Sequence, residues 1–352
     1  MAASPLVIHL LVPGLFGFVR GVEEAGCLPT VPLLERLLAR ARYQRTGGTD
    51  LAATLFDLFG ITTDKGKDLP TAALSRLGDG AKPDSEYWLH ADPVFLKPDG
   101  DRLLLFDAAH LEMRMQDAKG LAALFNEHFA EDGCYLEAST PSRWYLRVPE
   151  AADMVTSPLF DVVGRNIDTF LPKGPAAGRW HALLNEVQML FHAAQDNKRR
   201  EEERLLPVNS LWLSGGGALP HITNKPFSRA MADDPLTQGF AKSGGIDCRP
   251  LPASAEAFGN ESGELLVVYH HLQRSVVDSD PVGWQQGIEQ FQSWLEPLLR
   301  ALGQKRLDSL RLYACNGDSY CLDRGAWRRF WKRRRPLMSY LDKAVNNELR
   351  MS

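Results

Sequence analysis

The chain begins with a continuous apolar run, Leu6 to Val12, which ends at Pro13-Gly14. Apolar strands without a polar face are typical of parallel sheets that helices cover on both sides. Similar runs occur around Leu211, Leu265 and Leu310, and segments with helical spacing of apolar residues lie between them. The sequence therefore predicts an α/β fold with a mostly parallel main sheet and helices on both faces.

A different pattern interrupts this alternation between residues 84 and 150. Two strand-like segments, a helical segment and two further strand-like segments follow one another there, with turn residues at Asp99-Gly100. Because a ββαββ pattern of this kind is antiparallel, we expect an inserted α+β subdomain at residues 84–150 and an α/β core from residues 1–83 and 151–352. Residues 62–85, rich in glycine and proline, predict a surface connection, and residues 180–203 predict one long helix.

Composition restricts the class of protein. The 352 residues are 44% hydrophobic, with 40 basic and 44 acidic side chains and a net charge of −4, which excludes a disordered or fibrous chain. No segment approaches the roughly 20 apolar residues of a membrane span, so we expect no membrane association. The five cysteines are scattered and form no CxxC pair, which favours a reducing cytoplasmic location over a disulfide framework.

The strongest polar signal surrounds the Leu211 run. Asn197, Arg200 and Asn209 precede it, and Gly215-Gly216-Gly217 follow it. Glycines after a strand expose backbone N–H groups that often bind phosphate, so these six residues predict an anion pocket for a small phosphorylated or anionic ligand. The alternative is that the glycines mark only a tight turn.

This spacing, with the glycines after a Leu-Trp-Leu strand, resembles a motif of the archaeal-type, cofactor-independent phosphoglycerate mutases of the alkaline phosphatase superfamily. The chain resembles in particular a bacterial branch of regulatory proteins of the RpfE type, which share segments like residues 89–94 and an arginine-rich C-terminal end. The resemblance implies an alkaline-phosphatase-like core. Two positions depart from the motif: Arg204 replaces a usual glycine, and residues 194–197 replace a usual His-Pro-Val-Asn.

The resemblance also implies a chemistry that needs two divalent metals, bound by Asp and His ligands, and a Ser or Thr nucleophile. The family's first metal aspartate follows the first strand, where residues 12–17 of this chain contain neither a carboxylate nor a hydroxyl group. Residues 269–280 lack the family's spacing of further ligands, and the chain contains no Asp-His dipeptide. We therefore expect the fold of the mutases rather than their activity.

A rearranged metal site is the alternative, because His90 and Asp92 lie near Asp107 and His110 in the sequence. No cofactor is expected; if a metal binds, manganese or magnesium is the candidate. The ligand set would come from His90, Asp92, Asp107, His270 and Asp278. The alternative is that these Asp residues have a structural role in turns, because Asp side chains bond to their own backbone there. His270 and His271, on a strand, would point to opposite faces, so at most one would join a site.

The segment from Arg324 to Arg335 contains seven basic residues among Trp327, Phe330 and Trp331. Such a segment could bind nucleic acid through phosphates and stacking. The i, i+3, i+4 spacing of its aromatic residues instead favours an amphipathic helix packed on the sheet. With the net negative charge, this predicts no specific duplex binding and makes nucleic acid an unexpected partner.

We therefore expect a catalytically degenerate, phosphoglycerate mutase-like protein with a regulatory or anion-binding role in the cytoplasm. The alternatives are an active metal-dependent mutase or phosphatase and a nucleic-acid-binding regulator.

Overall fold

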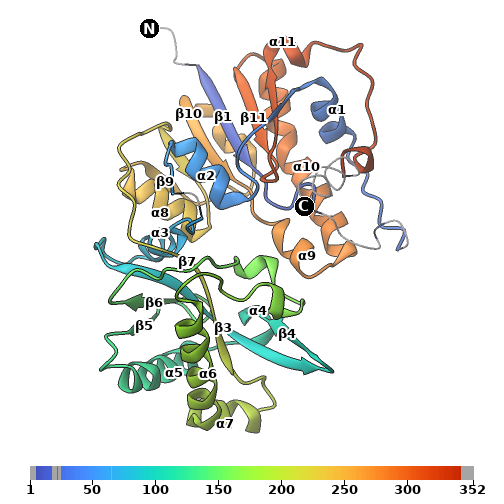
Figure 1. Cartoon of the computed structure of the whole chain (residues 1–352). Coiled ribbons are helices and arrows are strands. Elements are labelled where there is room, and N and C mark those ends of the chain that lie inside the picture. The colour runs from blue at the N-terminus through green and yellow to red at the C-terminus, as the bar shows by residue number, and fades with distance from the viewer. Residues whose placement is uncertain (1–4, 18–21, 23–24, 65, 342–352) are drawn as a thin grey trace. The chain divides into compact units, whose positions relative to one another are not determined.

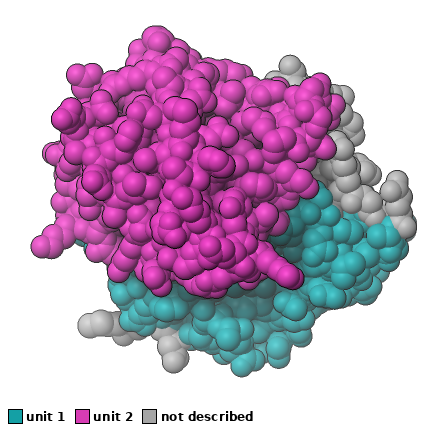
Figure 2. All heavy atoms as spheres, turned by 90° about the horizontal axis from the view of Figure 1, so that it is seen from below, with its two compact units in different colours: residues 1–61, 222–352 teal, residues 62–221 magenta. Residues whose placement is uncertain are grey.

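The first apolar run forms β1 (Leu6–Leu11), the central strand of a seven-stranded sheet (Figure 1). The computed structural model describes residues 5–17, 22, 25–64 and 66–341. The chain divides into two compact units, coloured separately in Figure 2: unit 1, residues 1–61 and 222–352, and unit 2, residues 62–221. Unit 2 therefore includes the expected 84–150 subdomain together with flanking segments on both sides.

The sheet of unit 1 is mostly parallel, as the apolar runs predict. Its strand order is β2-β12-β11-β1-β10-β8-β9, in which β1 pairs in parallel with β10 and β11, and β8 with β10 and β9. Only β12 and β2 are antiparallel. The strands are β2 (Arg42–Arg45), β8 (Arg229–Met231), β9 (Asp247–Arg249), β10 (Gly263–Val268), β11 (Ser309–Tyr313) and β12 (Asp318–Asp323).

Helices cover both faces of this sheet (Figure 1). Ile8 and Leu10 of β1 join a buried cluster with α1 (Pro32–Arg40) and α10 (Pro281–Gly303). Because strand side chains alternate, His9 lies on the other face, where its ring contacts Phe227. On that side α2 (Leu51–Phe59) and α8 (Pro235–Ser243) pack together through their phenylalanines. Unit 1 also contains α9 (Gln273–Val277), α11 (Arg324–Trp327) and the 3₁₀ helix η3 (Ala255–Asn260).

Unit 2 contains an antiparallel five-stranded sheet. Its order is β4-β3-β6-β5, and β7 pairs with the long strand β3. The strands are β3 (Tyr87–Asp99), β4 (Arg102–Phe106), β5 (Tyr135–Ala138), β6 (Trp144–Val148) and β7 (Ser210–Gly217). One face packs on α5 (Met115–His128) and α6 (Ala177–Ala193), and the other carries α3 (Thr71–Gly78). The unit also has α4 (Ala108–Leu111), α7 (Gln195–Glu202), and the 3₁₀ helices η1 (Leu159–Asp161) and η2 (Ile167–Thr169).

Three local predictions are wrong. The Leu211 run belongs to β7, which pairs antiparallel with β3 rather than joining the parallel sheet, because an apolar run does not specify its partner. The predicted connection at 62–85 contains α3, whose short buried face is masked in the sequence by flanking glycines and prolines. The predicted helix at 180–203 is two helices, because the backbone of Ala194 between them is extended.

None of the helices in the described part of the chain is long and apolar enough to cross a membrane.

Candidate functional site

The carboxyl ends of β8 and β10 carry the residues best suited to chemistry in unit 1. Ligands of open α/β sheets bind at this edge, where the parallel strands end. Asp233 follows β8, and His270 with His271 follows β10, the neighbouring strand. One ligand atom from each of the three side chains lies within 4.8 Å of the others. Among the described residues, this is the one group of three His, Cys, Asp or Glu side chains close enough to hold a metal ion.

The turn after β10 orients the two imidazoles. The N–H of Gln273 donates to the carbonyl of His270 at 3.1 Å and leads into α9. Tyr269, whose ring packs at a tilt against those of Phe291 and Trp294, places its ring 4.9 Å from that of His271. The two histidine rings are 4.6 Å apart. The prediction that they point to opposite faces is wrong, because β10 ends at Val268 and the chain turns before reaching them.

The surroundings of His271 suit cation binding. Burial lowers the pKa of His271, and the neighbouring His270 lowers it further, while Asp233 opposes the shift. His271 is therefore a neutral imidazole near pH 7, the form that binds metals. The Nδ1 atom of His270 is buried without a hydrogen-bond partner, and Oδ1 of Asp233 accepts from the N–H of Leu251 at 3.2 Å.

These donors define the kind of ion. Two imidazoles and a carboxylate match Zn²⁺ or Mn²⁺ better than Mg²⁺, which prefers oxygen ligands. Asp233 and His271 are exposed, so an ion bound there would keep a coordination position open to solvent or to a ligand.

Asp234, beside the cluster, has a structural role. It caps α8, since its Oδ1 accepts from the N–H of Thr237 at 2.8 Å. Its Oδ2 is buried without a hydrogen-bond partner, and burial raises the pKa of this carboxyl while His270 opposes the shift.

The end of β1 is packed rather than polar. Val12 and Leu15 are buried, and the indole N–H of Trp284 donates to the carbonyl of Gly14 at 3.1 Å. Gly14 has a φ of +84°, and a Cβ there would lie 2.9 Å from the backbone of Leu272. This turn therefore requires glycine for packing, and its described residues offer no metal ligand.

Of the five metal ligands suggested by the sequence, only His270 lies in the cluster. Asp278, also in unit 1, is bonded to Arg274 at 2.6 Å. Oδ1 of Asp107, in unit 2, is hydrogen-bonded to Nδ1 of His110 at 2.7 Å. The described residues form no second three-ligand group that contains His90, Asp92, Asp107 or Asp278.

His90 and Asp92 lie on one face of β3, since they are two residues apart. Burial lowers the pKa of His90 to about 4 and raises the pKa of Asp92 to about 7. Oδ1 of Asp92 is buried and has no hydrogen-bond partner. Both groups are thus biased toward their neutral forms by desolvation.

The residues suggested for the anion pocket bind the chain's own groups. Asn197 donates to the carbonyls of Phe191 and Val208 and accepts from the N–H of Val208, at 2.7–2.9 Å. Arg200, 1% exposed, pairs with Asp117 at 2.8 Å and donates to two backbone carbonyls. Burial raises the pKa of Asp117, but the hydrogen bonds from Arg199 and Arg200 outweigh it and lower the pKa.

Asn209 and the three glycines also contact other parts of the protein. Asn209 exchanges two hydrogen bonds with the backbone of Leu96, at 2.7 and 2.9 Å. A Cβ on Gly215, Gly216 or Gly217 would lie 2.0–2.6 Å from side chains of α3, its preceding proline or β3. The anion pocket stays a prediction, but these contacts explain the same residues by packing.

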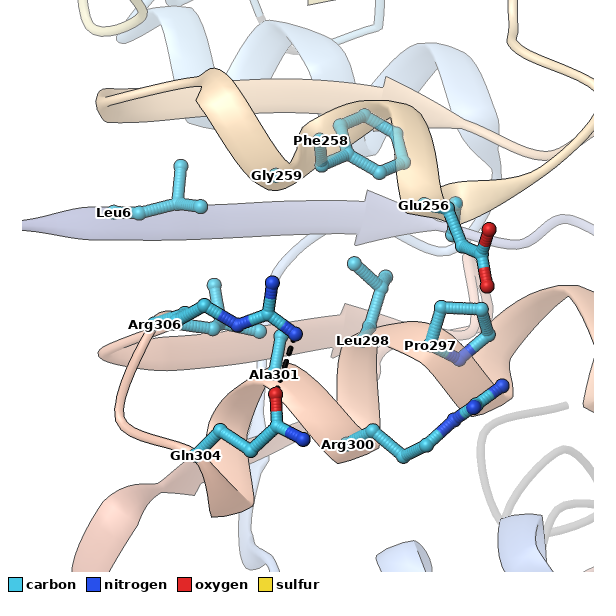
Figure 3. A pocket seen from close by; sticks show the side chains of 12 residues that line it. Leu6, Glu256, Phe258, Gly259, Pro297, Leu298, Arg300, Ala301, Gln304 and Arg306 are labelled. Carbon is cyan, nitrogen blue, oxygen red and sulfur yellow. Dashed lines mark hydrogen bonds between the residues drawn. The ribbon is translucent and has the colours of Figure 1, made fainter.

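A pocket of about 310 Å³ lies at the other end of the parallel strands (Figure 3). Leu6, the first residue of β1, and Leu298 of α10 line it with Phe258, and Arg306 hydrogen-bonds Gln304 at its rim. Since the amino ends of parallel strands rarely carry the site, we assign no function to it.

The sequence interpretation missed Asp233 and His271. Asp233 follows β8, a strand of three residues that is too short to be recognised from its pattern. β10 ends at Val268, two residues before His270, and a strand continued through the histidines would separate His271 from His270. A signal did exist: adjacent histidines directly after an apolar strand are at the edge where parallel sheets bind ligands.

Solved structures show that the chain has a known type of fold. No family model matches the chain. The solved PH0037 protein from Pyrococcus horikoshii aligns with 92% of this chain and 88% of its own length, with a TM-score of 0.57 and 12% identity. The cofactor-independent phosphoglycerate mutase from Thermoplasma acidophilum aligns with 90% of the chain, with a TM-score of 0.46 and 16% identity. The chain thus has the mixed α/β fold of the PH0037 protein, with a mostly parallel and an antiparallel sheet.

Curated proteins give a more particular similarity. The chain is 37% identical over 71 residues to a probable 2,3-bisphosphoglycerate-independent phosphoglycerate mutase from Geobacter sulfurreducens. It is 32% identical over 76 residues to the 2,3-bisphosphoglycerate-independent phosphoglycerate mutase from Methanosarcina barkeri. These matches cover 20–22% of the chain and 18–19% of the relatives. The chain is therefore similar to these mutases over about a fifth of its length.

Proposed function

We propose that the chain is a phosphoglycerate mutase-like protein that has lost two-metal phosphoryl transfer and has a cytoplasmic regulatory role, as in proteins of the RpfE type. In this proposal it binds one divalent cation at Asp233, His270 and His271. The cation, in turn, attracts a small phosphorylated or anionic ligand. The proposal is supported by the partial similarity to the mutases and by the three possible metal ligands at the carboxyl ends of β8 and β10.

A single observation carries this proposal. Among the described residues there is one three-ligand group, which contains a single carboxylate, and β1 ends in buried apolar residues. Two-metal catalysis needs two sets of metal ligands, one on each side of the transferred group. One mononuclear group supports cation binding more directly than it supports mutase chemistry.

Cation binding is tested by thermal unfolding of the whole chain with Mn²⁺ or Zn²⁺ and then with EDTA. An ion that binds the folded state stabilises it by about 2.7 kcal/mol when its concentration is about 100 times Kd. We expect the metal-dependent rise in Tm to disappear in His271→Ala and to persist in His192→Ala, which removes an exposed histidine of α6. Equal metal responses in the two variants would contradict the proposed site.

Activity is tested with 3-phosphoglycerate and with a generic phosphoester, with added manganese and then with chelator. We expect no metal-dependent turnover. The second candidate function, an active metal-dependent mutase or phosphatase, is favoured by the exposed, open side of the Asp233 group. Manganese-dependent turnover that is lost in His271→Ala would replace the first proposal with the second.

A further inference from the structure

The basic segment near the C-terminus does not form the helix that its sequence predicts. Helix α11 ends at Trp327, and only this aromatic residue packs against the core, where Arg40 lies 4.9 Å from its ring. Phe330 is 80% exposed and Trp331 is 64% exposed. The expectation that all three aromatic residues dock on the sheet is therefore wrong, because the helix stops after four residues.

Most basic side chains of this segment form no ion pair with another described residue. Arg334 pairs with Glu35 at 3.2 Å and Arg324 with Asp308 at 3.0 Å. No ion pair with another described residue involves the remaining five basic side chains. These are Arg328, Arg329, Lys332, Arg333 and Arg335. The segment thus presents a local excess of positive charge on a chain whose net charge is negative.

A pocket of about 410 Å³ adjoins these cations. Lys332, Arg333 and Arg335 line it together with Tyr43, Tyr320 and Tyr340. Tyr43 is 51% exposed on β2, the edge strand of the sheet, and its ring is 5.6 Å from that of Tyr320. Cations and aromatic faces therefore occur together both in the pocket and beside it.

We infer that this basic aromatic surface, formed by residues 328–335 with Tyr43, Tyr320 and Tyr340, binds single-stranded nucleic acid. Phosphates would contact the five cations, and bases would stack on Trp331, Phe330 or Tyr43. Unpaired bases expose the faces that such stacking needs, whereas those of a duplex do not. The segment also lacks a long helix that could enter a major groove, which disfavours duplex recognition.

The test is fluorescence anisotropy of the full chain in EDTA, with labelled single-stranded RNA and DNA of about twelve nucleotides and with a duplex of the same sequence. We expect micromolar binding of the single strands and weaker binding of the duplex. If about four phosphates are contacted, affinity should fall about 20-fold between about 50 and 150 mM salt. EDTA separates this result from the cation site, so either proposal can fail without the other.

Two pairs of variants separate stacking from charge. Trp331→Ala, which keeps every cation, should weaken single-strand binding about tenfold, whereas Phe160→Ala, at another exposed aromatic residue, should not. Arg333→Gln with Arg335→Gln should reduce the salt slope by about 1.4, unlike Lys97→Gln with Lys119→Gln. Because Trp331 is exposed, its variant should keep the wild-type Tm.

Three outcomes would overturn the inference. The first is no single-strand binding at about 50 mM salt, where electrostatic contacts are strongest. The second is unchanged binding in Trp331→Ala, which would leave only nonspecific charge. The third is equal or tighter binding of the duplex, of poly-glutamate or of anionic lipid vesicles, each of which would assign the surface to another class of partner.

Discussion

At the scale of single residues, the buried carboxyl of Asp92 is the clearest electrostatic feature of unit 2. Burial raises its pKa from 3.8 to about 7, and one of its oxygens has no hydrogen-bond partner. The folded state therefore binds the proton more tightly than the unfolded chain. The contribution of Asp92 to stability is most favourable at low pH and is lost as pH rises from about 4 to about 7.

We predict that Asp92→Asn is more stable than the wild type at about pH 8, by roughly 1–3 kcal/mol, and that this difference disappears near about pH 4. Urea unfolding of both proteins across this range measures the difference. His90, whose pKa is lowered to about 4, is present in both proteins and cancels from the comparison. Asp101→Asn, at a fully exposed carboxylate, should show no such dependence, and an equal difference at both pH values would contradict the prediction.

At the scale of elements, the packing of α3 on β7 explains two of the three consecutive glycines, Gly215 and Gly217. Gly215 has a φ of +61°, and a Cβ there would lie 2.0 Å from Oγ1 of Thr71. A Cβ on Gly217 would lie 2.5 Å from Cβ of Pro70, at the start of α3. The glycines let the helix approach the strand closely, which no larger residue allows without movement of one element.

We predict that Gly215→Ala destabilises unit 2 by about 3 kcal/mol or more, through steric overlap added to an unfavourable φ. Gly100→Ala is the matched control, because Gly100 has a φ of +63° but open space around it. It should cost about 1 kcal/mol. Denaturant unfolding of the whole chain measures both values, and equal losses would show that only backbone conformation matters at Gly215.

At the scale of the whole molecule, each unit has its own hydrophobic core. The largest core cluster of unit 2 lies entirely within residues 89–213, and that of unit 1 combines residues before 61 with residues after 222. The two parts of unit 1 lie close where the chain leaves and returns, since a Cβ on Gly60 would be 3.9 Å from the side chain of Asn224. Independent cores predict independent folding.

We predict that residues 62–221 fold alone, and that residues 1–61 joined to residues 222–352 by a short glycine-serine linker also fold. Cooperative thermal unfolding and dispersed NMR amide signals of each fragment test this. Chemical shifts of the isolated unit 2 core should match those in the full chain. A fragment with helical CD signal but no cooperative transition would show that its core is incomplete.

Local elements with a strong apolar pattern or turn chemistry are predictable from the amino-acid sequence. The Leu6 run forms β1, α2 ends at Gly60, which has a φ of +69°, and the strands around Asp99-Gly100 pair as a hairpin. Each follows from neighbours in the chain: a continuous apolar run, a left-handed cap, or a two-residue turn. The lack of a carboxylate after the first strand was likewise readable from the sequence.

Which elements pack against one another depends on the three-dimensional fold. It paired β7 with β3, placed Arg200 against Asp117, and joined Asp233 to the two histidines across neighbouring strands. It also left Trp331 exposed. These outcomes depend on contacts between residues far apart in the chain. An apolar pattern predicts that a strand is buried but not which strand it pairs with. A polar residue looks the same in the sequence whether its side chain binds a ligand or the protein's own backbone.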